Sequence, residues 1–142
     1  MRLSKKAIEK TFSLESEFGK FLVTIRQARV GDDLRRAELM ATSSLVITDQ
    51  LLAQEIKQKL NPEEVRRYEI YLTMVDCDIE DEAEDGSTKP WFNFINHRLT
   101  SQADFERAYG LLPSDIAHKI HDSVREVNPQ WNNNGGDQEE GE

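Results

Sequence analysis

Apolar and polar residues alternate on both sides of the run Glu17-Phe18-Gly19-Lys20. The alternating apolar positions are Phe12, Leu14, Phe21, Val23 and Ile25. A period of two with β-branched residues is typical of strands. The pattern therefore predicts a β-hairpin over residues 12–27, in which the glycine-containing run turns the chain. Residues 4–11, which precede it, are expected to form a short helix capped by Ser4.

After Gly31 the apolar spacing changes to a helical period of about 3.6 residues. The residues on this spacing are Leu34, Ala37, Ala41, Leu45, Thr48, Leu52 and Ile56. Further apolar residues widen the stripe, so we expect a helix through residue 59 that is buried on more than one side. Asp32 and Asp33 suit its positive N-terminal end. The weak helix formers around Thr42-Ser43-Ser44 leave open whether this region is one helix or two.

A further helix is expected to begin at Asn61. Asn61 suits the N-cap, Pro62 suits the first helical position, and acidic residues follow in the first turn. The apolar face of this helix is Val65, Tyr68, Leu72, Val75 and Ile79. Residues 68–74 also alternate as a strand would, but the helical spacing covers more residues and begins at a cap. We therefore predict a helix that continues to Ile79.

The C-terminal part of the chain has clear helix boundaries. A helix over residues 101–109 is expected to end at Gly110, a residue that favours helix C-termini. After the connector Leu111-Leu112-Pro113-Ser114, a second helix over residues 115–127 is expected to end at Asn128-Pro129. This arrangement is typical of a helical hairpin.

Together these elements predict a mainly α fold. We expect one compact helical domain over residues 1–131, with a small N-terminal β-hairpin and a helical hairpin at its end. An acidic loop over residues 76–89 should lie within this domain. Residues 132–142 contain no apolar side chain and are expected to be a disordered acidic tail.

Negative charge is concentrated in two segments. The formal net charge is −9, from 27 acidic and 18 basic residues. Seven acidic residues lie within residues 76–85 and four within residues 137–142, so the rest of the chain is nearly neutral. An acidic protein is a poor candidate for nucleic-acid binding. We expect the arginines to pair with glutamates rather than form a basic patch; the arginines are Arg26, Arg29, Arg35, Arg36, Arg66 and Arg67, and the glutamates are Glu38, Glu63, Glu64 and Glu69.

No residue pattern points to catalysis. The single cysteine, Cys77, excludes an intrachain disulfide, and its neighbours Asp76 and Asp78 disfavour a thiolate. His118 and His121 are one helical turn apart, but a zinc site needs further ligands, and we expect both histidines to be solvated. Phosphate-binding loops, nucleophile elbows and zinc-protease helices are absent from the sequence. We therefore expect a protein that is not an enzyme and uses no metal or cofactor.

The sequence has no apolar run close to the roughly 20 residues that a membrane span needs. No apolar segment of the kind found in signal peptides follows the basic N-terminus. We expect a soluble intracellular protein that makes no membrane contact.

Aromatic residues are the best candidates for a contact surface, because aromatic side chains dominate binding hot spots. We select Trp91, Phe92 and Trp131 as partner-binding residues. Trp131 is expected outside any helix and beside the acidic tail. For Phe92 and Phe94, a place in the core is at least as good an interpretation.

Two stretches of the sequence carry a resemblance to a known family. One is Phe21-Leu22-Val23-Thr24-Ile25-Arg26-Gln27-Ala28, which leads through Gly31-Asp32-Asp33 into Leu34-Arg35-Arg36. The other is the Leu112-Pro113 connector with the helix that closes in Val124-Arg125-Glu126-Val127-Asn128-Pro129-Gln130-Trp131. Together they cover about a third of the chain. They resemble the tail assembly chaperones of long-tailed, siphovirus-type bacteriophages.

The resemblance implies a non-enzymatic, mainly helical protein of the host cytoplasm. Such chaperones bind the tape measure protein, keep it soluble and help tail tube subunits to assemble around it. The expected partners are therefore the tape measure protein and the tail tube protein, with further copies of the same chain as an additional candidate. Two other classes stay open: a small nucleic-acid-binding regulator that uses the arginines, and a structural adaptor of the virion.

Overall fold

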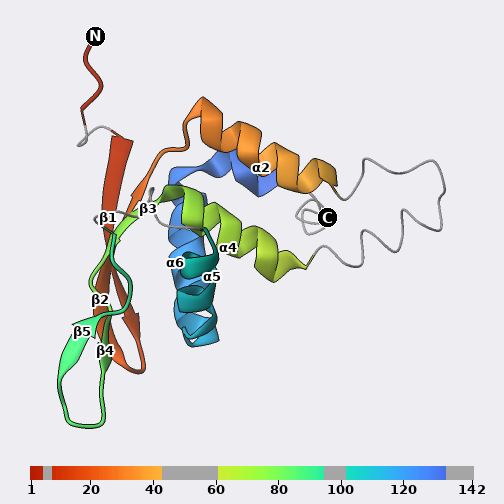
Figure 1. Cartoon of the computed structure of the whole chain (residues 1–142). Coiled ribbons are helices and arrows are strands. Elements are labelled where there is room, and N and C mark those ends of the chain that lie inside the picture. The colour runs from red at the N-terminus through yellow and green to blue at the C-terminus, as the bar shows by residue number, and fades with distance from the viewer. Residues whose placement is uncertain (5–7, 43–60, 95–101, 134–142) are drawn as a thin grey trace.

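The computed structural model describes residues 1–4, 8–42, 61–94 and 102–133 of the 142-residue chain (Figure 1). A three-stranded antiparallel sheet lies against helices, and a two-stranded hairpin extends from one end of it. The elements are β1 (Glu9–Ser16), β2 (Gly19–Arg26), α2 (Val30–Thr42), α4 (Pro62–Thr73), β3 (Met74–Cys77), β4 (Glu80–Glu82), β5 (Thr88–Pro90), α5 (Gln102–Gly110), α6 (Ser114–Val127) and the 3₁₀-helix η1 (Pro129–Asn133).

The predicted N-terminal hairpin is confirmed. Strands β1 and β2 pair antiparallel in one uninterrupted register from Glu9 opposite Arg26 to Ser16 opposite Gly19. Gly19 has a φ of 126°, which a residue with a side chain adopts only with strain, so the turn depends on this glycine. Residues 9–11 belong to β1, so the short helix expected over residues 4–11 is wrong there.

Helix α4 begins as predicted but ends earlier. The Asn61 side chain accepts a hydrogen bond from the Glu63 amide at 2.8 Å, and Pro62 occupies the first turn. The chain leaves the helix after Thr73, and Met74 pairs with Ile25 of β2. The predicted continuation to Ile79 is wrong, because pairing with the sheet overrides the local helical spacing.

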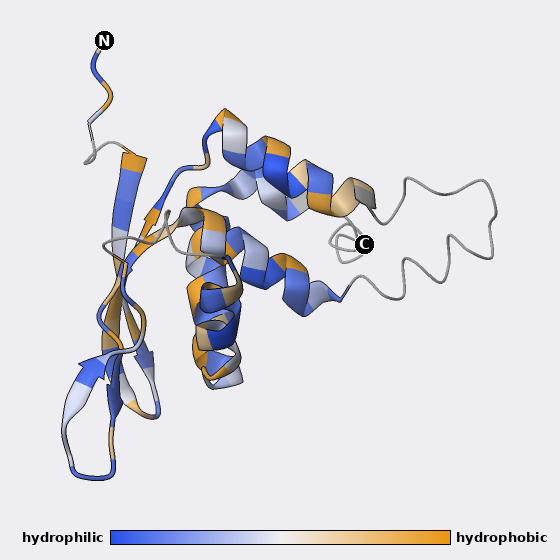
Figure 2. Cartoon of the chain, in the orientation of Figure 1, coloured by the Kyte–Doolittle hydropathy of each residue, from blue (hydrophilic) through white to orange (hydrophobic). Residues whose placement is uncertain are grey.

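Half of the segment expected to be an acidic loop, residues 76–89, lies in strands. It contributes the end of β3 and the hairpin β4–β5, in which Glu80 lies opposite Pro90. Gly86 has a φ of 90° at the tip of this hairpin. All residues of the two strands are exposed, and Figure 2 shows the hairpin as almost entirely hydrophilic.

These strands correct the predicted fold class. The mainly α fold with a single hairpin is wrong, since the described part of the chain combines four α-helices with a three-stranded and a two-stranded sheet. The helices pack together on the three-stranded sheet, which is an α+β arrangement. Sequence spacing missed this class because β3, β4 and β5 are only three or four residues long.

The core lies between the sheet and the C-terminal helical hairpin. Helix α6 packs on both β1 and β2, and α4 packs on α6 (Figure 1). The fully buried apolar side chains are Val23, Ile25, Ile70, Leu72, Met74, Phe105, Ile120 and Val124. The α5–α6 hairpin is confirmed within one residue of its predicted bounds. Asn132 and Asn133, the first two residues of the disordered tail predicted over residues 132–142, belong to η1. The rest of that tail lies outside the described residues, as do residues 43–59 of the long predicted helix.

Candidate functional site

Helix α2 rests on the body of the protein through charged side chains. Asp32 and Arg36 are one turn apart on its inward face and are both buried. Asp32 Oδ2 lies 2.7 Å from Arg26 Nη2 of β2, and Arg36 Nε donates to Glu69 Oε2 of α4 at 2.5 Å. Both ion pairs are almost completely removed from solvent. The inward face of α2 is therefore unusually polar for a helix that covers a core.

The Glu69 carboxylate joins three helices. Its Oε1 atom lies 2.5 Å from His121 Nε2 of α6, while its Oε2 atom accepts from Arg36 of α2. His121 is buried, so the prediction that it is a solvated surface residue is wrong. Each oxygen of this buried carboxylate therefore has a polar partner, a guanidinium on one side and an imidazole on the other.

Trp131 completes this anchorage from η1. The prediction that it lies outside any helix is wrong, because the 3₁₀-helix places it against α2 with only 4% of its surface exposed. Its Nε1 atom donates to Asp33 Oδ1 at 2.9 Å, and the Arg36 guanidinium lies 5.3 Å from its ring centroid. In this position Trp131 fixes α2 to the end of α6 and has little surface left for a partner.

The outward face of α2 is apolar. Val30 and Leu34, one turn apart, are 75% and 60% exposed, and Ala37 and Ala41 continue the stripe as exposed residues. Apolar positions recur along α2 in Figure 2. The apolar spacing predicted that the face containing Leu34, Ala37 and Ala41 is buried, and within α2 that prediction is wrong.

The apolar spacing alone could not predict that the apolar face of α2 is turned outward. A helical repeat of apolar residues shows that a helix is two-faced, but it does not say which face meets the protein body. Val30 escaped selection because the helix was expected to begin near Asp32. The available signal was the charged pair Asp32 and Arg36 on the opposite face, each with an opposite charge elsewhere in the chain.

Trp91 and Phe92, the other two aromatic residues predicted to bind a partner, belong to a cluster that contacts α5. Trp91 is 7% exposed, and its Nε1 atom donates to the Ala108 carbonyl at 2.8 Å. Phe92 is half-buried, and its ring meets Phe105 edge-on with centroids 5.3 Å apart. The core interpretation considered for Phe92 therefore describes its main contacts.

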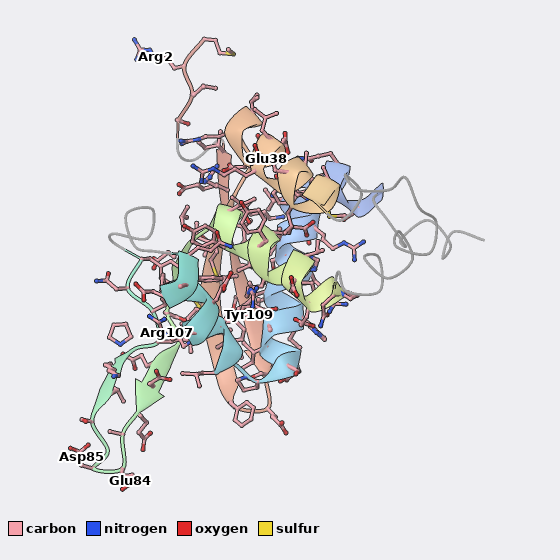
Figure 3. All side chains as sticks on the ribbon, turned by 45° about the vertical axis from the view of Figure 1, so that its right-hand side comes forward. Arg2, Glu38, Glu84, Asp85, Arg107 and Tyr109 are labelled. Atoms are coloured by element: carbon pink, nitrogen blue, oxygen red, sulfur yellow. The ribbon has the colours of Figure 1, made fainter. Side chains whose placement is uncertain are left out.

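An open cleft of about 450 Å³ lies where α4 begins, α5 ends and α6 begins. The Glu63 carboxylate on its wall accepts from the Tyr109 hydroxyl at 2.7 Å and lies 2.6 Å from Arg66 Nη1. His118 Nε2 lies 3.0 Å from the same carboxylate. Figure 3 shows Tyr109 on α5 directed toward the neighbouring helices.

The electrostatics of this cleft favour a structural role. Burial raises the pKa of Glu63, but hydrogen bonds from His118 and Tyr109 and the charge of Arg66 outweigh it, so the pKa is lowered overall. Burial, followed by the hydrogen bond to Glu63, raises the pKa of the Tyr109 phenol. A carboxylate held in its charged form is a weak base, and a phenol with a raised pKa is a weak acid. The cluster ties three helices together.

Four of the six arginines considered for a basic patch are buried or paired. Arg26 and Arg36 are buried, Arg66 pairs with Glu63, and Arg67 Nη2 lies 3.4 Å from Glu106. The predicted pairing with glutamates is confirmed for Arg36 with Glu69 and for Arg66 with Glu63.

Cys77 is buried, and burial raises the pKa of its thiol to about 12. Within the described ranges, no group of three or more His, Cys, Asp or Glu side chains is placed to hold a metal ion. In the same part of the chain, no helix is long and apolar enough to cross a membrane.

No known protein family, curated protein or solved structure matches this chain.

Proposed function

We propose that this protein is a non-enzymatic chaperone of phage tail assembly. In this proposal it covers apolar helical segments of the tape measure protein in the host cytoplasm, until tail tube subunits assemble around that protein. One observation carries the proposal: α2 turns its charged face to the protein body and its apolar face to solvent. The resemblance carried by residues 21–36 and 112–131 includes the first turns of this helix.

The α2 face suits reversible binding. Complete burial of a Val or Leu side chain contributes about 1.5–3 kcal/mol. Val30 and Leu34 keep 75% and 60% of their surface exposed, so covering both contributes about 2–4 kcal/mol. One such contact is weak once the cost of association is included. Many copies along a long client would hold it firmly, while each copy remained easy to displace.

Two further features support this role. The buried ion pairs and Trp131 hold α2 in one orientation, so the apolar face needs no ordering when a client arrives. The acidic β4–β5 hairpin lies at the far end of the molecule from α2 (Figure 1). Its charge opposes aggregation of loaded chaperones.

Co-expression with a tape measure fragment tests the proposal. The wild-type chain should raise the soluble fraction of the fragment, and Leu34→Glu should remove most of that effect. Leu111→Glu is the matched control, because Leu111 is 78% exposed but lies on the α5–α6 connector. Equal protection by wild type and Leu34→Glu, with both proteins folded by circular dichroism, would refute the proposal.

A structural adaptor of the virion could use the same face. Mass spectrometry of purified virions separates the two roles, since a chaperone should be absent from the finished particle and an adaptor should be present.

A further inference from the structure

The residues that border the apolar stripe of α2 are acidic on both sides. Each residue of an α-helix advances by about 100°, so Asp33 and Glu38 lie about 70° to either side of the line through Val30, Leu34 and Ala37. Both carboxylates are on exposed residues, and Figure 3 labels Glu38 on α2. The other bordering positions are Gly31 and Met40, which carry no charge.

The cations of α2 lie away from this border. Arg36 is on the inward face and is paired with Glu69. Arg35 is exposed, but it lies about 130° from the centre of the stripe. The outward face of α2 therefore combines an apolar stripe with negative charge along both edges.

We infer that the α2 face takes a partner helix whose own apolar stripe is bordered by lysine or arginine, an inference that rests on the proposed function. When two helices pack along apolar stripes, the residues beside the stripes meet across the interface and set partner choice through their charges. Lysine or arginine in those positions of the partner lies opposite Asp33 and Glu38.

The same charges disfavour a second copy as the occupant. Two α2 helices packed through this face would bring four carboxylates to the edges of the interface. Like charges at these edges oppose pairing. A client helix with basic residues along its edges is attracted by these carboxylates, whereas a second copy of α2 is repelled by them.

Three labelled amphipathic peptides test the inference. They share a Leu/Ala stripe over about four helical turns and differ only in the bordering residues, which are all Lys, all Gln or all Glu. We expect affinity for the full-length protein to fall in the order Lys, Gln, Glu at low salt. The differences should vanish in 1 M salt, where the Debye length is about 3 Å.

Variants of the protein test whether the preference for the Lys peptide comes from the α2 face. The variant Asp33→Asn/Glu38→Gln keeps the oxygen that accepts a hydrogen bond from Trp131. It should weaken binding of the Lys peptide about 2- to 25-fold, because each lost charge weakens it about 1.4- to 5-fold. Glu82→Gln/Glu84→Gln changes net charge equally on the distant hairpin and should leave affinity unchanged. Leu34→Glu should abolish binding of all three peptides.

The outcomes separate the inference from the function. Equal affinity for the Lys and Gln peptides, with binding still lost in Leu34→Glu, overturns the charge inference and leaves the proposed function standing. No binding of any peptide overturns both. Self-association that Leu34→Glu abolishes makes a second copy the occupant. Slow labelling of Leu34→Cys by a thiol reagent in the isolated monomer would mean that the chain covers this face itself. Both this result and self-association through α2 overturn the inference.

Discussion

Replacing Arg36 by Met tests whether α2 is held by buried charge. Arg36 and Glu69 are both almost completely buried, and their closest atoms are 2.5 Å apart. Removing one partner of a buried ion pair costs about 3–5 kcal/mol, because the other charge is left in a poorly solvating environment. His121 remains beside Glu69 and offsets part of this loss. We therefore expect Arg36→Met to lower the free energy of unfolding by about 2–4 kcal/mol.

Urea denaturation followed by tryptophan fluorescence measures this effect. For a chain of this size the loss corresponds to a fall of about 6–15 °C in Tm. Arg35→Met is the matched control, because Arg35 is the neighbouring residue but is exposed. It should stay within about 0.5 kcal/mol of wild type.

A double variant tests whether the unpaired Glu69 carboxylate causes the loss of stability. Arg36→Met/Glu69→Gln also removes the stranded carboxylate and should recover about 1–2 kcal/mol relative to Arg36→Met alone. If Arg36→Met unfolds with the same free energy as Arg35→Met, buried charge does not hold α2 in place. A double variant less stable than Arg36→Met would show that the stranded carboxylate is not the source of the loss.

Three further predictions follow from other contacts. Because the pKa of Glu63 is lowered in the folded protein, its carboxylate stabilises the fold above the ordinary pKa of 4.5 and loses this contribution as pH falls through the folded pKa. The stability of Glu63→Gln should therefore depend less steeply on pH in acid, and an unchanged acid profile would contradict this. Burial raises the pKa of Cys77 to about 12, so a thiol reagent at about pH 8 should label the native protein slowly and the urea-unfolded protein rapidly, whereas equal rates would place the thiol at the surface. Gly19→Ala should cost about 1 kcal/mol of stability, because its φ of 126° strains any side chain, and Gly110→Ala outside the left-handed region is the control, with equal losses refuting strain at Gly19.

Local signals predicted the elements that depend on neighbouring residues. Asn61 and Pro62 located the start of α4, and the alternation around Gly19 located the β1–β2 hairpin. The end of α4 depends instead on Met74 pairing with Ile25, which lies far away in the sequence. A short strand that follows a helix without a break has no period of its own to detect.

The contacts of the candidate site were harder to predict from the sequence. His121 and Glu69 are 52 residues apart, and Trp131 and Asp33 are 98 apart, so no local spacing indicates either contact. Helical spacing did identify Leu34, but burial was assumed because most two-faced helices turn their apolar side inward. Only the tertiary contacts of Asp32 and Arg36 show that α2 is turned the other way.

The orientation of α2 separates two kinds of constraint on one short helix. Changes at Asp32 or Arg36 remove buried contacts, whereas changes at the exposed Val30 and Leu34 leave those contacts in place. Under the proposed function, the recognition surface can therefore diverge over evolution without loss of stability. If the proposed function holds, exchanging the outward residues of α2 for those of another protein should give a chimera that folds normally and prefers a different client.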